Sequence, residues 1–92
     1  MSETLVKTLK IQNKKGLHAR AASAFVKTAE QFDADIFVEK DGTRVCGTSI
    51  MGLMMLAAAK ENEIKVITRG NEAPEAMQAL TDLINSKFNE EE

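Results

Sequence analysis

The sequence predicts a single α+β domain in which amphipathic helices cover one face of a mostly or wholly antiparallel sheet. The first observation is the order of the expected elements: strand, helix, strand, strand, helix, strand and helix. The second is that no helix clearly links two parallel neighbours in a doubly wound pattern. A chain of 92 residues is long enough for one core and too short for two. We therefore expect one domain over residues 1–88 and a frayed acidic tail over residues 89–92.

Four short segments have the pattern of strands. Over residues 5–12, 35–40 and 64–68, side chains alternate between two faces, as in half-buried strands. The dipeptide Asp41-Gly42 is typical of a tight hairpin turn, so residues 43–46 are predicted to form the returning strand.

Three segments have the pattern of helices. The first begins at Ala19, and its apolar residues recur at helical spacing along one face: Ala22, Phe25, Val26, Ala29 and Phe32. The second is short, covers residues 50–56 and follows a cap at Ser49 or Thr48. The third follows a cap at Asn71 and carries an apolar stripe, which consists of Ala76, Met77, Leu80, Leu83, Ile84 and Phe88.

Composition excludes several classes of protein. Hydrophobic residues make up 43% and charged residues 28%, the balance of a folded soluble domain. The apolar run over residues 50–59 is far short of the roughly 20 residues that a membrane span needs. The N-terminus lacks the apolar stretch of a signal peptide, so we expect a cytoplasmic protein without membrane insertion.

The small numbers of histidine, cysteine and aromatic residues exclude further kinds of function. One histidine and one cysteine give no ligand set for a structural metal, and we expect no cofactor. Cys46 is interpreted as a half-buried strand residue without a function. Four Phe without Trp or Tyr provide no platforms for stacking on bases, so nucleic acid is not an expected partner.

Charge is distributed unevenly along the chain. Residues 1–28 hold six basic side chains against one acidic side chain, a net charge of +5, whereas residues 29–92 have a net charge of −7. A basic surface of this size suits a phosphate group or an acidic protein partner.

His18 is the first candidate for chemistry, because it stands between a glycine turn and the start of the first helix. The free amides of roughly Ala19 to Ala22 are expected to point at a phosphate carried on His18. Arg20 adds a charge-assisted contact to the same oxygens, while Lys14 and Lys15 raise the local potential. The spacing alone also fits a histidine that only caps the helix or lines the surface. No triad or carboxylate pair of a hydrolase is present in the sequence.

The second candidate is the apolar run that begins at Ile50. Its side chains are too numerous for one narrow stripe, so Ile50 and Met51 are expected to face outward and form a docking surface. The alternative is that they all fill the core. A phosphate on Ser49 would add roughly −2 charge beside this surface, which would disfavour docking.

Two motifs together resemble the HPr family, the phosphocarriers of the bacterial phosphoenolpyruvate-dependent phosphotransferase system. They are Gly16-Leu17-His18-Ala19-Arg20-Ala21-Ala22 and Thr48-Ser49-Ile50-Met51-Gly52. The resemblance covers nearly the whole chain and implies an open-faced β-sandwich, in which three helices cover one face of four antiparallel strands. It also implies a phosphoryl carrier and not an enzyme.

The resemblance implies a role for each matched residue. His18 matches the histidine that accepts the phosphoryl group on Nδ1 from Enzyme I and passes it to enzyme IIA domains, and Arg20 matches the arginine that steadies the phosphate. Ser49 matches the serine phosphorylated by HPr kinase/phosphorylase in many members. Ile50 and Met51 match the partner-docking residues, and Lys27 falls near the edge of that surface. A carrier of this kind is expected to work as a monomer.

Two points stay open at the level of sequence. Ala21 stands where the family motif usually has proline, which leaves an extra free amide and is expected to affect rate or partner preference. The chain is similar both to HPr and to NPr, the paralogue of the nitrogen-related system.

A different hypothesis is a regulatory binding module, whose docking is controlled by Ser49 phosphorylation while His18 is incidental.

Overall fold

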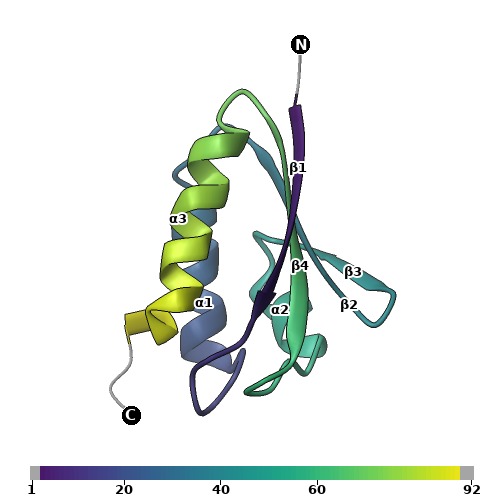
Figure 1. Cartoon of the computed structure of the whole chain (residues 1–92), viewed down its shortest axis with the longest axis vertical. Coiled ribbons are helices and arrows are strands. Elements are labelled where there is room, and N and C mark those ends of the chain that lie inside the picture. Colours follow the sequence, from purple (N-terminus) through teal and green to yellow (C-terminus); the bar gives the residue numbers. More distant parts are fainter. Residues whose placement is uncertain (1–2, 90–92) are drawn as a thin grey trace.

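Four strands form one antiparallel sheet in the computed structural model, which describes residues 3–89 (Figure 1). The strands are β1 (Glu3–Lys10), β2 (Asp35–Lys40), β3 (Thr43–Cys46) and β4 (Glu63–Gly70). Their spatial order is β1-β4-β2-β3, and each neighbouring pair is antiparallel. The predicted antiparallel sheet is confirmed.

The helices form a second layer on one face of this sheet (Figure 1). They are α1 (Ala19–Ala29), α2 (Ile50–Met55) and α3 (Ala73–Asn85), and a short 3₁₀ turn, η1 (Lys87–Asn89), follows α3. The helices α1 and α3 pack side by side, while α2 packs against α1 and β3 near one end of the sheet. The predicted α+β class, with helices on one face of the sheet, is therefore confirmed.

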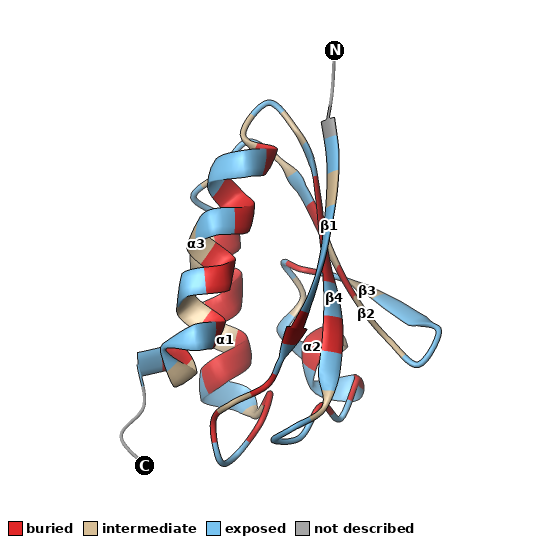
Figure 2. Ribbon diagram, in the orientation of Figure 1, coloured by how far each residue is buried: buried red, intermediate tan, exposed pale blue. Residues whose placement is uncertain are grey.

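The core lies between the two layers, and Figure 2 shows that the long helices bury the sides that face the sheet. The predicted face of α1 is buried at Ala22, Phe25, Val26 and Ala29, whereas Phe32 is half-buried because it lies beyond the helix end. In the predicted apolar stripe of the third helix, Leu83 is half-buried and the other residues are buried, including Phe88 in η1. Helical periodicity therefore identified the sides of both helices that pack on the sheet.

The hairpin between β2 and β3 turns at Asp41-Gly42, as predicted. The backbone φ angles there are +51° and +82°. Two successive positive φ angles define the tight turn whose twist matches that of the flanking strands.

The expected cap of α3 at Asn71 is wrong. The N-cap residue is Glu72, and its side chain makes no capping bond. Both residues instead contact Asp33: the Asn71 Nδ2 donates to Asp33 Oδ2 at 2.9 Å, and the Glu72 Oε1 accepts from the Asp33 amide at 2.6 Å. A tertiary contact with the segment before β2 has replaced the local cap.

Cys46 is exposed, so the prediction of a half-buried residue is wrong. It pairs with Phe37 at the end of β3, which is an edge strand. Successive strand residues point to opposite faces. Val45 packs against the core, and Cys46 therefore points to the face that no helix covers.

Residues 90–92 of the expected acidic tail lie outside the described residues, and Asn89 belongs to η1. Within residues 3–89, no helix has the length and apolar character that crossing a membrane requires.

Candidate phosphate site and docking surface

His18 is the residue immediately before α1, as predicted, and its backbone is extended with φ −80° and ψ −179°. Its half-buried side chain makes no capping bond to the helix. The first bond of the helix runs from the Ala22 amide to the His18 carbonyl oxygen at 2.8 Å. The amides of Ala19, Arg20 and Ala21 precede this bond and lie at the open end of the helix. The Ala22 amide is not available to a ligand, which corrects the expectation for that residue.

The loop before His18 is held by hydrogen bonds to Ala58 and by hydrogen bonds within the loop itself. The Leu17 amide donates to the Ala58 carbonyl at 2.9 Å, and the Gly16 carbonyl accepts from the His18 amide and from Asn13 Nδ2. Gly16 has a φ of +66°, and a Cβ atom at this position would lie 2.3 Å from the Ala58 oxygen. Only glycine fits here, because both the backbone angle and the close approach exclude a side chain.

A second pair of hydrogen bonds joins the same two loops. The Ile11 amide donates to the Asn62 carbonyl at 2.9 Å, and the Glu61 amide donates to the Ile11 carbonyl at 2.8 Å. The segment before His18 is thus fixed against the loop that follows α2. The position of the histidine depends on contacts between residues more than 40 positions apart.

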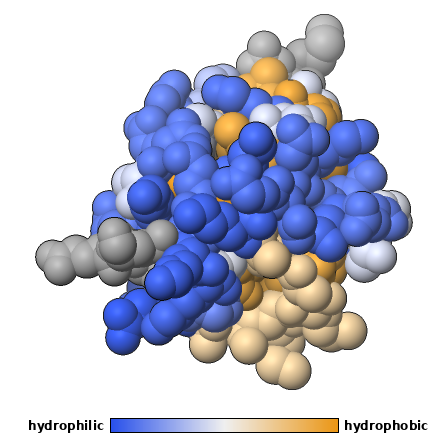
Figure 3. Space-filling model, turned by 60° about the horizontal axis from the view of Figure 1, so that its bottom comes forward, coloured by the Kyte–Doolittle hydropathy of each residue, from blue (hydrophilic) through white to orange (hydrophobic). Residues whose placement is uncertain are grey.

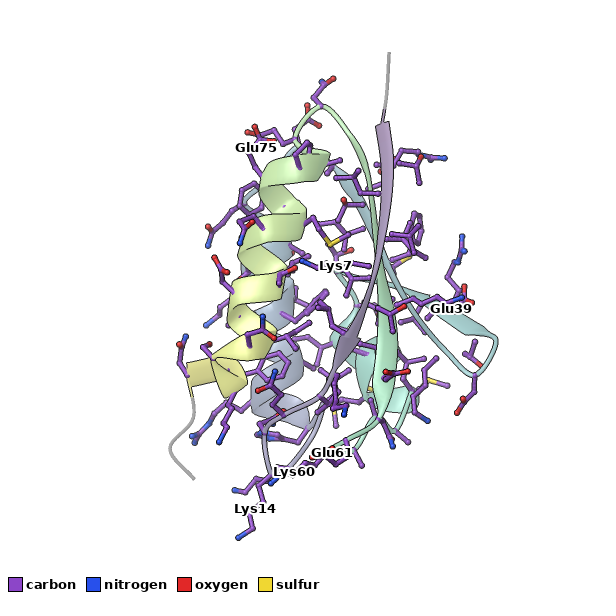
Figure 4. All side chains as sticks on the ribbon, viewed as in Figure 1. Lys7, Lys14, Glu39, Lys60, Glu61 and Glu75 are labelled. Carbon is purple, nitrogen blue, oxygen red and sulfur yellow. The ribbon has the colours of Figure 1, made fainter. Side chains whose placement is uncertain are left out.

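Several basic side chains are exposed near this end of the molecule. Lys14, Lys15 and Arg20 are exposed, and Figure 4 shows Lys14 and Lys60 at the same end. Within residues 3–89, Arg20 has no ion-pair partner. The guanidinium is thus not held by a carboxylate in the described part of the chain, and it lies two residues from His18.

The helix α2 exposes an apolar surface and buries only its opposite side. Ile50 and Met51 are 39% and 70% exposed, which confirms that they face outward. The structure adds two exposed residues that the sequence analysis missed, Met54 and Met55. The signal was present, because Met51, Met54 and Met55 have the i, i+3, i+4 spacing of one helix face.

We call these four residues, Ile50, Met51, Met54 and Met55, the α2 patch. The opposite side of the segment is anchored by Leu53 and Leu56, which are 0% and 5% exposed. In Figure 3 the end of the molecule that carries α2 is turned forward, and hydrophobic side chains gather there beside a broad hydrophilic surface. An exposed apolar cluster of this kind indicates a protein-binding surface.

Ser49 is half-buried and caps α2, because its Oγ accepts from the Gly52 amide at 3.0 Å. A Cβ atom on Gly52 would lie 3.1 Å from both the Ser49 Oγ and the Val45 Cβ. Gly52 therefore allows the start of the helix to lie close to β3. Of the two predicted caps, Ser49 is the one observed.

Lys27 is exposed in the last turn of α1. It is eight residues after Ala19, which corresponds to roughly 12 Å along a helix axis. Its assignment to the edge of a docking surface stays a prediction.

One groove, with a volume of about 710 Å³, does not have His18 in its lining. It is lined by β1, the β2–β3 hairpin, the loop before β4 and the first residues of β4, including Lys10, Glu39, Asp41, Glu61 and Lys65. Both signs of charge line it, and Figure 4 shows Glu39 on the hairpin, far from the start of α1. Within residues 3–89, no cluster of three or more His, Cys, Asp or Glu side chains is arranged to hold a metal.

Comparison with known proteins agrees with this geometry. The chain matches the family described as PTS HPr component phosphorylation site over residues 5–86. It is 54% identical over 88 residues to the phosphocarrier protein HPr of Neisseria meningitidis, covering 96% of this chain and 99% of that protein.

Solved structures of HPr proteins have the same fold as this chain. HPr-C-His from Thermoanaerobacter tengcongensis superposes with a TM-score of 0.91 at 48% identity, covering 96% of this chain and 99% of that one. An HPr dimer from the same organism superposes with a TM-score of 0.76 at 49% identity, covering 89% of this chain and 94% of that one.

The chain has the open-faced α+β sandwich fold of these phosphocarrier structures. The chain belongs to the HPr family, the phosphocarriers of the bacterial phosphotransferase system. HPr is a phosphocarrier protein and not a catalyst.

Proposed function

We propose that this chain accepts a phosphoryl group from phospho-Enzyme I on Nδ1 of His18 and passes it to enzyme IIA domains. One observation carries the proposal: His18 occupies the cap position of α1 without capping it. The amides of Ala19, Arg20 and Ala21 are left for the phosphate oxygens, and the positive end of the helix dipole favours their negative charge. Arg20 supplies a further charge.

The transfer is a displacement at phosphorus. The Nδ1 lone pair attacks the phosphorus atom, the bond between phosphorus and the donor breaks, and the donor keeps that electron pair. Nδ1 must carry no proton when it attacks, so the imidazole proton resides on Nε2. The same steps run in the opposite sense when an acceptor attacks the phosphohistidine. Positioning is the main requirement, because phosphoryl transfer has a loose transition state.

The α2 patch is the surface on which we propose that donor and acceptor dock in turn. One small surface must serve both partners, so binding has to be weak and exchange fast. Unbranched methionine side chains suit such a surface because they adapt to different partners. We propose that the carrier works in the cytoplasm as a single chain, with Lys27 at the edge of the contact.

The test is phosphorylation of the purified chain by phosphoenolpyruvate and Enzyme I, followed by intact mass and phosphorus NMR. We expect one acid-labile phosphate on the wild type and none on His18→Ala. Ser49→Ala is the matched control, since it removes a different candidate acceptor and should be phosphorylated like the wild type. Equal phosphorylation of His18→Ala and the wild type would exclude the proposed acceptor. Repeating the experiment with Enzyme I of the nitrogen-related branch distinguishes an HPr-type from an NPr-type chain.

A second role is favoured by the position of Ser49 beside the α2 patch. We propose that HPr kinase/phosphorylase phosphorylates Ser49 as a regulatory mark. A phosphate there is favoured by the positive end of the α2 dipole and adds roughly −2 charge next to Ile50 and Met51. The added charge beside the apolar α2 patch weakens docking of the phosphotransfer partners.

Comparing Ser49→Asp with Ser49→Ala tests this second role. The aspartate variant should lose about tenfold in the rate of transfer from Enzyme I, a change equivalent to about 1.4 kcal/mol. The alanine variant should stay close to the wild type. The opposite result would make the chain a regulatory binding module instead. In that case Ser49 substitutions change the affinity for partners, while His18→Ala changes neither phosphate acceptance nor that affinity.

A further inference from the structure

Three of the five methionines in the chain lie on one short helix and are accessible to solvent. Met51, Met54 and Met55 are 70%, 40% and 77% exposed, whereas Met77 in α3 is 8% exposed. Their i, i+3, i+4 spacing places the three thioether groups on one helix face. Thioether sulfur is the side-chain group that peroxide converts to a sulfoxide, and access to the sulfur governs that reaction.

We propose that Met51, Met54 and Met55 form an oxidation site at which hydrogen peroxide reversibly weakens the docking of phosphotransfer partners. The inference rests on the proposed function, because it takes the α2 patch as the docking surface. At each site a sulfur lone pair attacks one peroxide oxygen, the O–O bond breaks, and the second oxygen takes the proton of the attacked oxygen and leaves as water. Sulfur is oxidised and peroxide is reduced. Methionine sulfoxide reductase, with a thiol as reductant, restores the thioether.

The effect on docking follows from the polarity of the product. A sulfoxide oxygen is a hydrogen-bond acceptor, and burying it against an apolar partner without a donor is unfavourable. The fold is not affected in the same way, because α2 is anchored through Leu53 and Leu56, which are buried and contain no sulfur. Oxidation thus changes the surface and leaves the packing behind it intact.

Cys46 has to be separated from this effect, because it is also exposed. It lies at the end of β3 and points to the uncovered face of the sheet. The experiment is therefore done on the full chain carrying Cys46→Ser, which removes the competing thiol.

The first measurement is a map of sulfoxides by peptide mass spectrometry during graded treatment with hydrogen peroxide. We expect Met51, Met54 and Met55 to gain one oxygen each before Met77 does. Met77 is a built-in control, since it has the same chemistry in a buried position. Oxidation of Met77 at the same dose as the other three would overturn the site.

The second measurement is the rate of phosphoryl transfer from Enzyme I after catalase has removed the peroxide. We expect the oxidised protein to be about tenfold slower and to recover after treatment with methionine sulfoxide reductase. A variant with Met51→Leu, Met54→Leu and Met55→Leu keeps a similar volume and should have the same rate before and after peroxide. Unchanged transfer by the oxidised protein, or an equal loss in the leucine variant, would overturn the effect on docking. If the untreated protein accepts no phosphate, the proposed function fails, while the sulfoxide map still decides whether the site exists.

Discussion

The N-terminal ends of α1 and α2 differ in how they are capped, although both are proposed to face phosphotransfer partners. At α1 the side chain of the cap residue His18 makes no capping hydrogen bond, and the preceding loop is fixed by backbone hydrogen bonds. At α2 the cap residue Ser49 bonds to the Gly52 amide, and the exposed surface consists of flexible side chains. The proposed transfer site is thus built from fixed backbone, and the proposed docking surface is built from adaptable side chains.

This difference matches the two tasks. Transfer requires a phosphorus atom to be held in line with the attacking nitrogen, and small displacements reduce the rate strongly. Docking has to accept several partners, which favours side chains that can repack. The two helices pack against each other, so the two proposed sites lie at one end of the molecule. Substitutions that disturb only one of the two regions test whether the tasks are separable.

The largest expected effect is at Gly16, which fixes the loop before His18. Gly16→Ala forces a side chain into a positive φ conformation and against the Ala58 carbonyl. We expect a loss of roughly 4 kcal/mol in the free energy of unfolding, measured by urea denaturation. Gly42→Ala is the matched control, since Gly42 also has a positive φ but no atom lies within 4 Å of the added Cβ. It should lose only about 1 kcal/mol. Equal losses would show that the contact with Ala58 is unimportant.

The next prediction distinguishes the buried side of α2 from its exposed side. Leu53→Ala removes a fully buried side chain and should reduce the free energy of unfolding by about 3 kcal/mol. Met54→Ala, one residue further on, should change it by less than about 0.5 kcal/mol while lowering the affinity for Enzyme I. Thermal unfolding and titration calorimetry measure the two quantities. A large stability loss for Met54→Ala would mean that the α2 patch supports the fold.

A smaller effect distinguishes the two cap residues. Ser49→Ala removes a capping bond and should destabilise the protein by about 1 kcal/mol. His18→Ala removes no capping bond and should reduce the free energy of unfolding by less than Ser49→Ala does, although it is expected to abolish phosphorylation. Denaturation curves of both variants under the same conditions measure the difference. If His18→Ala is the more destabilising of the two, the histidine has a structural role that its backbone geometry does not reveal.

The smallest expected effect is at Ala21. Proline is tolerated in the first turn of a helix because the amide there has no partner within the helix. Ala21→Pro should therefore alter the free energy of unfolding by less than about 1 kcal/mol and slow transfer only a few-fold, through loss of one amide donor. Stopped-flow transfer from Enzyme I measures the rate. A rate unchanged by proline would show that the Ala21 amide does not contact the phosphate.

Local sequence determined the elements and part of the site. Alternation and helical spacing gave the strands and the buried faces of the long helices, because one side of each element must pack on the core. Asp41-Gly42 predicted the hairpin, since few residues adopt two successive positive φ angles. The position of His18 before α1 and the outward direction of Ile50 and Met51 also followed from spacing. These features depend only on residues a few positions apart.

Tertiary structure decided what depends on distant residues. Asn71 does not cap α3, because its side chain bonds to Asp33, 38 positions away. Cys46 is exposed because β3 is an edge strand and no helix covers the face to which it points. Gly16 is required because the loop after α2 packs against it. Sequence patterns record which side of an element is apolar, whereas the partner that a side chain or loop contacts is fixed only when the chain folds.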